Sequence, residues 1–128
     1  RVQVVLRYAP FHPGADTMVA ILESSRRQDK YWETLEIMFS TQSEWASHHS
    51  PQPDRIWAFL EAGGLDVARL RADMQDPAIA ALIAQDLKDA ETLRVTKTPG
   101  FFVNGTPLTN FGKGPLTALV DAEVAAAY

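Results

Sequence analysis

Residues 95–105 read VTKTPGFFVNG, the stretch of this chain from which its fold is most readily predicted. A proline at position 99 follows the end of a helical pattern, and an aromatic run, Phe101 to Val103, comes directly after it. Aromatic and β-branched runs of this kind favour a strand. Asn104-Gly105 is the strongest two-residue signal for a β-hairpin, because both residues readily take the positive φ angles of its turn. We therefore predict a helix end, a strand and a tight hairpin that returns from Thr106.

The chain before this stretch is predicted to form one strand and then a series of helices. Residues 1–8 alternate with a period of two and are rich in β-branched residues, which predicts a strand buried largely on both faces. From Ala15 the apolar spacing becomes helical, and we expect helices from there to about residue 94. A last helix follows the hairpin, so the fold class is α/β. The residues that define the strand are Val2, Val4, Leu6 and Tyr8 on one face and Val5 on the other.

Glycines, aspartates and a proline mark where several helices begin and end. Gly63-Gly64 can take the left-handed conformation that closes a helix, and Asp66 can cap the next helix. Asp76-Pro77 starts the clearest helix of the chain, because a capping carboxylate is followed by proline in the first turn. In that helix Asp86 is predicted to face water.

Length and composition restrict the class of protein. A chain of 128 residues with an apolar fraction of 46% fits a single domain over residues 1–128. The net charge of −4 comes from interspersed acids and bases, so nucleic acid is not an expected partner. No apolar run approaches the roughly 20 residues needed to cross a bilayer, so membrane insertion is not expected. The chain starts at Arg1 in strand-like sequence, which suggests that an upstream segment is missing.

The stretch at 95–105 resembles the cis-proline loop of thioredoxin-fold proteins. That resemblance, together with the hairpin signal, predicts a cis Thr98-Pro99 bond, a form that costs roughly 0.5–1 kcal/mol for a bond preceding proline. The order of strand, helices, Thr-Pro-Gly-Phe-Phe-Val-Asn-Gly hairpin and closing helix is similar to the DsbA-like branch, whose domain carries a helical insertion. The resemblance covers nearly the whole chain and places the insertion at about residues 15–94. This resemblance implies a thioredoxin-like fold with a DsbA-like insertion, incomplete at the N-terminus.

The same resemblance implies a thiol-disulfide oxidoreductase or disulfide isomerase that acts on cysteine-bearing proteins or peptides. Thr98 and Pro99 are carried over as substrate-binding positions, where Thr98 would offer its backbone to an extended substrate peptide as an added strand does. A threonine before the proline resembles the bacterial disulfide isomerases of this superfamily, whereas the strongly oxidising member has valine at that position. One residue does not determine the direction of electron flow. No cofactor and no metal ion are expected. The resemblance alone implies a periplasmic or cell-envelope location.

The chain departs from this family in one large respect. It contains no cysteine, whereas the family begins with a strand and a helix that carries Cys-x-x-Cys, so no catalytic residue is assigned here and this chain alone is expected to be inactive. In the family the missing strand lies centrally in the sheet, and its loss would leave two open edges. We therefore expect the protein either to extend upstream or to pair abnormally, as a homodimer or a swapped assembly.

Two other functions on the same fold stay open. One is a cysteine-free module that binds a peptide or a partner protein without redox turnover, and the other is a glutathione-using isomerase. A Cys-x-x-Cys upstream of Arg1 would favour the oxidoreductase, whereas a native start near Arg1 would favour the binding module. Glutathione binding would favour the isomerase.

Several conspicuous side chains have plainer interpretations. His48-His49 with Asp54 suggests a metal site, but adjacent histidines in a polar loop without a regular zinc spacing are expected to be solvated. His12 is expected to make a structural hydrogen bond. The tryptophans occur at helical positions and are expected to pack between helices: Trp32, Trp45 and Trp57.

Overall fold

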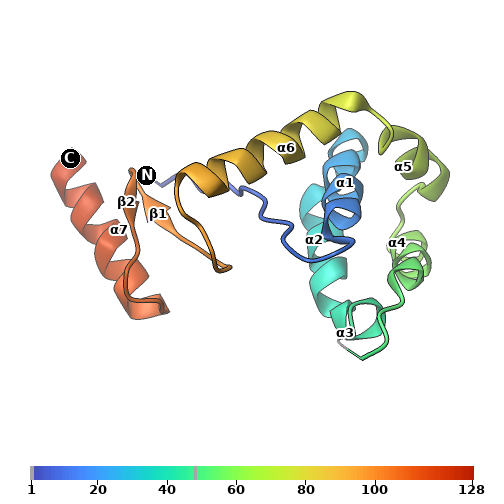
Figure 1. Cartoon of the computed structure of the whole chain (residues 1–128), viewed down its shortest axis with the longest axis horizontal. Helices are drawn as coiled ribbons and strands as arrows, with labels where there is room; N and C mark the ends of the chain where they lie inside the picture. Colours follow the sequence, from blue (N-terminus) through green and yellow to red (C-terminus); the bar gives the residue numbers. More distant parts are fainter. Residues whose placement is uncertain (1, 48) are drawn as a thin grey trace. The chain divides into compact units, whose positions relative to one another are not determined.

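The computed structural model describes residues 2–47 and 49–128, and its elements follow the predicted order from the first helix onward (Figure 1). The chain divides into two compact units. We call Tyr8–Lys88 the helical unit, and Arg1–Arg7 with Asp89–Tyr128 the terminal unit. Within the described residues, no helix is both long enough and apolar enough to pass through a membrane.

The helical unit is built from short helices joined by turns and loops (Figure 1). Its elements are α1 (Ala15–Ser25), a 3₁₀ turn (Arg26–Gln28), α2 (Tyr31–Ser40), α3 (Gln42–Trp45), a second 3₁₀ turn (Pro53–Arg55), α4 (Ile56–Ala62) and α5 (Val67–Asp73). Helix α6 (Pro77–Thr92) begins in this unit and ends in the terminal unit.

One buried cluster holds these helices together, because α1 packs against α2 and α5 while α2 packs against α4. Complete burial of a leucine or isoleucine side chain contributes roughly 1.5–3 kcal/mol, so several such residues make a substantial core. The buried members are Ile21, Leu22, Tyr31, Met38, Ile56, Leu60, Leu65 and Leu70.

The end of α4 confirms the prediction made from its glycines. Gly64 has a φ angle of 88°, a left-handed value that costs glycine little because it has no Cβ. The N–H of Leu65 then donates to the carbonyl of Leu60 at 3.0 Å. Both leucines are buried, so the hydrogen bond and the apolar contact of a Schellman helix end occur together.

Two aspartates cap helices as predicted. The carboxylate of Asp66 accepts a hydrogen bond from the backbone N–H of Arg69 at 3.0 Å, at the start of α5. The carboxylate of Asp76 accepts one from the N–H of Ala78 at 2.9 Å, at the start of α6. Each carboxylate satisfies one of the N–H groups that the first turn of a helix leaves without a partner.

The terminal unit contains the predicted hairpin and the last helix. Strands β1 (Phe102–Val103) and β2 (Thr106–Pro107) pair antiparallel, with Val103 opposite Thr106. Asn104 and Gly105 have φ angles of 48° and 84°, which confirms the two-residue turn. Helix α7 (Lys113–Ala127) packs against β1, beside the hairpin in Figure 1. Its half-buried apolar residues are Leu116, Leu119, Val120 and Val124.

The strand predicted at residues 1–8 is wrong for the described part of that segment. Residues 2–8 have no strand structure, and Val2, Val4 and Val5 are 63%, 75% and 67% exposed rather than buried. A strand forms only where a neighbour pairs with its backbone groups, and the sheet formed by the described residues is the two-stranded hairpin alone. The segment is held at its end, where Arg7 forms an ion pair with Asp89 at 2.5 Å.

The expectation for the tryptophans is confirmed for two of them and wrong for the third. Trp45 and Trp57 pack against the core cluster. Trp32 is 62% exposed, although it lies next to the buried Tyr31 on α2. Its neighbour turns inward and Trp32 does not, because successive helical residues point about 100° apart.

Candidate functional site

The loop at residues 96–100 is the site that sequence resemblance selected. Its Thr98-Pro99 peptide bond is cis, as predicted, and residues 96–100 are all exposed. In the part of the chain that the structure describes, neither the N–H nor the C=O of Thr98 has a hydrogen-bond partner. The loop therefore presents free backbone groups to a binding partner.

The C-terminal end of α6 determines where the loop at residues 96–100 begins. Arg94 has a φ angle of 56°, and the N–H of Val95 donates to the carbonyl of Ala90 at 2.8 Å. This hydrogen bond has the Schellman pattern seen at the end of α4, with arginine in the place of glycine. It ends α6 abruptly, so the chain leaves the helix before Thr98.

The hairpin supports the other side of the loop. The N–H of Leu108 donates to the carbonyl of Phe101 at 2.9 Å, which extends the pairing toward Pro99. The rings of Phe101 and Phe111 lie with their centroids 6.1 Å apart. Glu123 of α7 accepts hydrogen bonds from Asn104 and Thr106 at 3.3 Å each. The short strand beside the loop is thus held by contacts within the terminal unit.

A second cluster, in the helical unit, surrounds Tyr8. Its hydroxyl lies 2.6 Å from the hydroxyl of Tyr31 and donates to the carboxylate of Glu23 at 3.1 Å. Arg26 donates to Glu23 at 2.5 Å, and its guanidinium lies 3.7 Å from the centroid of the Tyr31 ring. Burial raises the pKa of the Tyr8 phenol well above its ordinary value, and the hydrogen bonds with Tyr31 and Glu23 raise it further. The phenol stays neutral, so this cluster acts as a structural anchor.

Asp86 completes that anchor, and sequence reasoning missed it. The prediction that it faces water is wrong, because Asp86 is 7% exposed and its carboxylate accepts the backbone N–H of Tyr8 at 2.9 Å. A signal was present in the sequence. Asp86 follows Ile79 and Ile83 by seven and three residues, which is the spacing of the inward face of α6.

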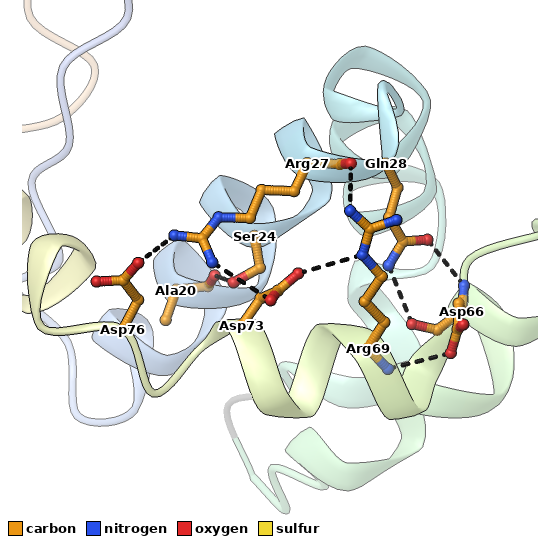
Figure 2. A network of polar contacts seen from close by, with 8 residues as sticks. All are labelled: Ala20, Ser24, Arg27, Gln28, Asp66, Arg69, Asp73 and Asp76. Atoms are coloured by element: carbon orange, nitrogen blue, oxygen red, sulfur yellow. Dashed lines mark hydrogen bonds and ion pairs between the residues drawn. The ribbon is translucent and has the colours of Figure 1, made fainter.

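Figure 2 shows a third polar cluster, where the first 3₁₀ turn meets α5 and the start of α6. Arg27 forms ion pairs with Asp73, at 3.3 Å, and with Asp76. The hydrogen bond from the N–H of Ala78, and then that from Arg27, hold the pKa of the Asp76 carboxyl below its usual value. Hydrogen bonding to Asp76 in turn raises the pKa of Arg27.

The other half of this cluster uses backbone groups. Gln28 donates to the carbonyl of Asp66 at 3.0 Å and accepts from its N–H at 2.9 Å, as a paired strand residue would (Figure 2). Arg69 donates to the carbonyl of Arg27 at 2.9 Å. The charged groups are used in joining the first 3₁₀ turn to α5 and to the start of α6, so the cluster is structural rather than a binding site.

The remaining candidates from the sequence do not come together as a site. His12, His49 and Asp54 are all exposed, and His48 lies outside the described residues. Within residues 2–47 and 49–128, no group of three or more histidine, cysteine, aspartate or glutamate side chains is arranged to hold a metal ion. The chain contains no cysteine, so its own residues supply no thiolate to the loop at Thr98.

Comparison with known proteins gives both a family and a set of relatives. The family described as Thioredoxin matches residues 2–122. The Na(+)/H(+) antiporter NhaA of Herminiimonas arsenicoxydans is 29% identical over 119 residues, which cover 92% of this chain and 18% of the antiporter. The Na(+)/H(+) antiporter NhaA 3 of Salinispora tropica is 32% identical over 107 residues, covering 81% of this chain and 16% of that protein. No solved structure matches the chain.

The chain spans less than a fifth of the length of these antiporters, so the similarity concerns one part of each. The range matched by the family, 2–122, includes the helices of the helical unit, the loop at Thr98-Pro99 and the hairpin. The fold is thus thioredoxin-like, mostly helical, with a small two-stranded sheet. On these grounds the chain belongs to the thioredoxin family.

Proposed function

We propose that this chain is the peptide-docking part of a DsbA-like thiol-disulfide oxidoreductase or isomerase, with Thr98 and Pro99 contacting the substrate. The observation that carries the proposal is the exposed loop in which the N–H and C=O of Thr98 have no partner among the described residues. An extended peptide can pair with such groups through main-chain hydrogen bonds, whatever its side chains are. Membership of the thioredoxin family supports the reaction class.

The redox step itself needs a thiolate that this chain does not contain. In thiol-disulfide exchange a thiolate attacks one sulfur of a disulfide, a new S–S bond forms, and the other sulfur leaves as a thiolate. We propose that a Cys-x-x-Cys elsewhere in the same gene product supplies the attacking sulfur. The residues of this chain then hold the substrate peptide beside it, and a periplasmic or envelope location would suit that role.

The test uses the full gene product, in insulin reduction and in oxidative refolding of a reduced, cysteine-bearing protein. Thr98→Pro removes the backbone N–H, and Thr98→Val keeps it while removing the hydroxyl. Loss of one hydrogen bond of about 1 kcal/mol is expected to lower kcat/KM for protein substrates about fivefold in Thr98→Pro. Thr98→Val is expected to retain the wild-type value, and both variants should react normally with dithiothreitol.

Three outcomes would contradict the proposal. A full gene product without cysteine that is inactive in both assays would favour the cysteine-free binding module. Glutathione-dependent isomerisation of small molecules would favour the glutathione-using enzyme. Equal losses toward insulin and dithiothreitol in Thr98→Pro would mean that the loop shapes the redox centre instead of docking a peptide.

A second candidate function follows from the relatives. Their similarity to this chain covers 18% and 16% of proteins named Na(+)/H(+) antiporters. We propose as the alternative that this chain is the thioredoxin-family part of such an antiporter. A gene product several times longer than 128 residues, with sodium-dependent proton exchange in membrane vesicles, would support it, whereas a short product without membrane segments would exclude it.

A further inference from the structure

Helix α2 exposes an apolar surface that the proposed function does not use. Trp32 and Phe39 are 62% and 67% exposed, while the opposite side of the same helix is buried in the core. The exposed pair and three intervening or adjacent residues line a shallow groove of about 600 Å³. We call it the α2 groove: Trp32, Leu35, Glu36, Phe39 and Ser40.

The α2 groove has carboxylates along one side. Seen down the helix axis, the apolar side chains of α2 form one stripe: Trp32, Leu35 and Phe39. Glu36 and Glu33 both lie on the same side of that stripe. Both glutamates are exposed, and across the described part of the chain neither has an ion-pair partner. An apolar stripe flanked by two unpaired carboxylates complements a ligand that is both apolar and basic.

Two other glutamates of the helical unit are paired with arginines of the chain itself. Glu23 is paired with Arg26 at 2.5 Å, and Glu44 is paired with Arg55 at 3.0 Å. The chain also stacks arginine on aromatic rings within itself, since the guanidinium of Arg71 lies 4.1 Å from the centroid of Trp57. On α2 the ring and the carboxylate are present without the cation.

We propose that the α2 groove binds a basic, apolar peptide segment of a partner protein. An arginine or lysine of that segment stacks on Trp32 and pairs with Glu36, and an apolar side chain lies between Trp32 and Phe39. Cations are attracted to the face of tryptophan, and a carboxylate one helical turn away adds a charge-assisted hydrogen bond. A second copy of this chain packed through its own α2 would bring no arginine or lysine to these glutamates, because α2 contains neither.

The binding experiment uses the full gene product and a fluorescein-labelled 14-residue peptide of leucine and arginine at helical spacing. Its twin carries glutamate in place of arginine. Binding is followed by fluorescence anisotropy at two salt concentrations. We expect the basic peptide to bind, its affinity to fall as salt rises, and the acidic twin not to bind.

Variants test the two halves of the groove separately. Trp32→Ser and Glu36→Lys are each expected to weaken the basic peptide at least about tenfold, and Glu36→Gln to weaken it less. Glu91→Lys, the same charge change at an exposed position of α6, is the matched control and should leave the affinity unchanged. Since the changed side chains are exposed, the circular dichroism spectrum should be that of the wild type.

Two results would overturn the proposal. The first is a failure of the basic peptide to bind, or equal binding of its acidic twin. The second is binding to phosphatidylcholine vesicles that Trp32→Ser abolishes, with no peptide binding, which would assign the groove to a membrane surface. Neither result depends on cysteine chemistry, so the redox assays test the proposed function independently.

Discussion

The helical unit and the terminal unit differ sharply in how they bury apolar side chains. Among the described residues, the buried apolar side chains belong to the helical unit with the exception of Ala90. The terminal unit instead leaves Val4 and Phe111 exposed, although it holds the loop at Thr98. The comparison shows that core formation and the proposed peptide docking are separated along the chain. Residues 8–88 provide a core of their own, and the proposed docking loop lies in a unit with little core.

The largest expected effect is the difference in stability between two leucine-to-alanine variants, one in each unit. Leu60 is 0% exposed and Leu93 is 55% exposed. Leu60→Ala is expected to lower the free energy of unfolding by about 2–5 kcal/mol, because it leaves a cavity in the core, whereas Leu93→Ala should change it by less than about 0.5 kcal/mol. Urea denaturation followed by tryptophan fluorescence reports on the helical unit, which contains all three tryptophans. Equal losses in the two variants would break the comparison.

The two Schellman helix ends allow a sharper comparison, since one lies in each unit. Gly64→Ala places a Cβ at a φ angle of 88° and is expected to cost about 1 kcal/mol in the urea experiment. Arg94→Gly removes a Cβ from the equivalent position at 56° and should stabilise the end of α6 by about 0.5–1 kcal/mol. Slower hydrogen exchange at the Val95 amide would show this gain. If Gly64→Ala were not destabilising, or if exchange at the Val95 amide were not slowed in Arg94→Gly, backbone conformation would not control these helix ends.

A buried hydroxyl tests how well the core of the helical unit is packed. Thr34 is fully buried on α2, and its hydroxyl has no hydrogen-bond partner among the residues that the structure describes. Thr34→Val replaces that hydroxyl with a methyl group of similar size, so the free energy of unfolding is expected to rise by about 1 kcal/mol. A higher urea midpoint in tryptophan fluorescence is the measurement. Thr34→Ser keeps the polar group and loses a methyl, and it should be less stable than the wild type.

The smallest effect is one of pH, at the cluster in Figure 2. The pKa of Asp76 is held below its ordinary 3.8, by the N–H of Ala78 first and then by Arg27. A carboxyl with a lowered pKa in the folded state stabilises above its unfolded pKa and loses that contribution as the pH falls through the folded value. Asp76→Asn should therefore lower the urea midpoint at pH 6 and differ little from the wild type at the lowest accessible pH. A constant difference across pH would contradict this.

Local chemistry explains most of what the sequence could predict. Asn104-Gly105, Asp66, Asp76 and Gly64 act through neighbours a few residues away, and the structure confirms each of them. The strand prediction is wrong over residues 2–8 for a physical reason, because alternation describes the faces of a strand but does not supply the neighbour that pairs with its backbone.

Local sequence patterns could not predict contacts between residues that are distant in the sequence, nor which backbone groups stay without a hydrogen bond. Its spacing in α6 indicates that Asp86 faces inward, but the partner of its carboxylate, the N–H of Tyr8, lies 78 residues away in the sequence. The outward direction of Trp32 depends on which side of α2 the core occupies. The role of Thr98 came from family resemblance, and its free N–H and C=O became apparent only in the folded chain.

The hairpin turn also contains a site that is prone to deamidation during storage. Asparagine is chemically labile, and it is most prone to deamidation where the next residue is glycine, which has no side chain to hinder attack by its backbone nitrogen. Asn104 precedes Gly105 in an exposed turn, and its amide donates to Glu123 at 3.3 Å. Deamidation would convert that donor into a carboxylate beside another carboxylate. Stored protein should accumulate a species heavier by about one mass unit at this residue, and its hairpin should be held less firmly to α7.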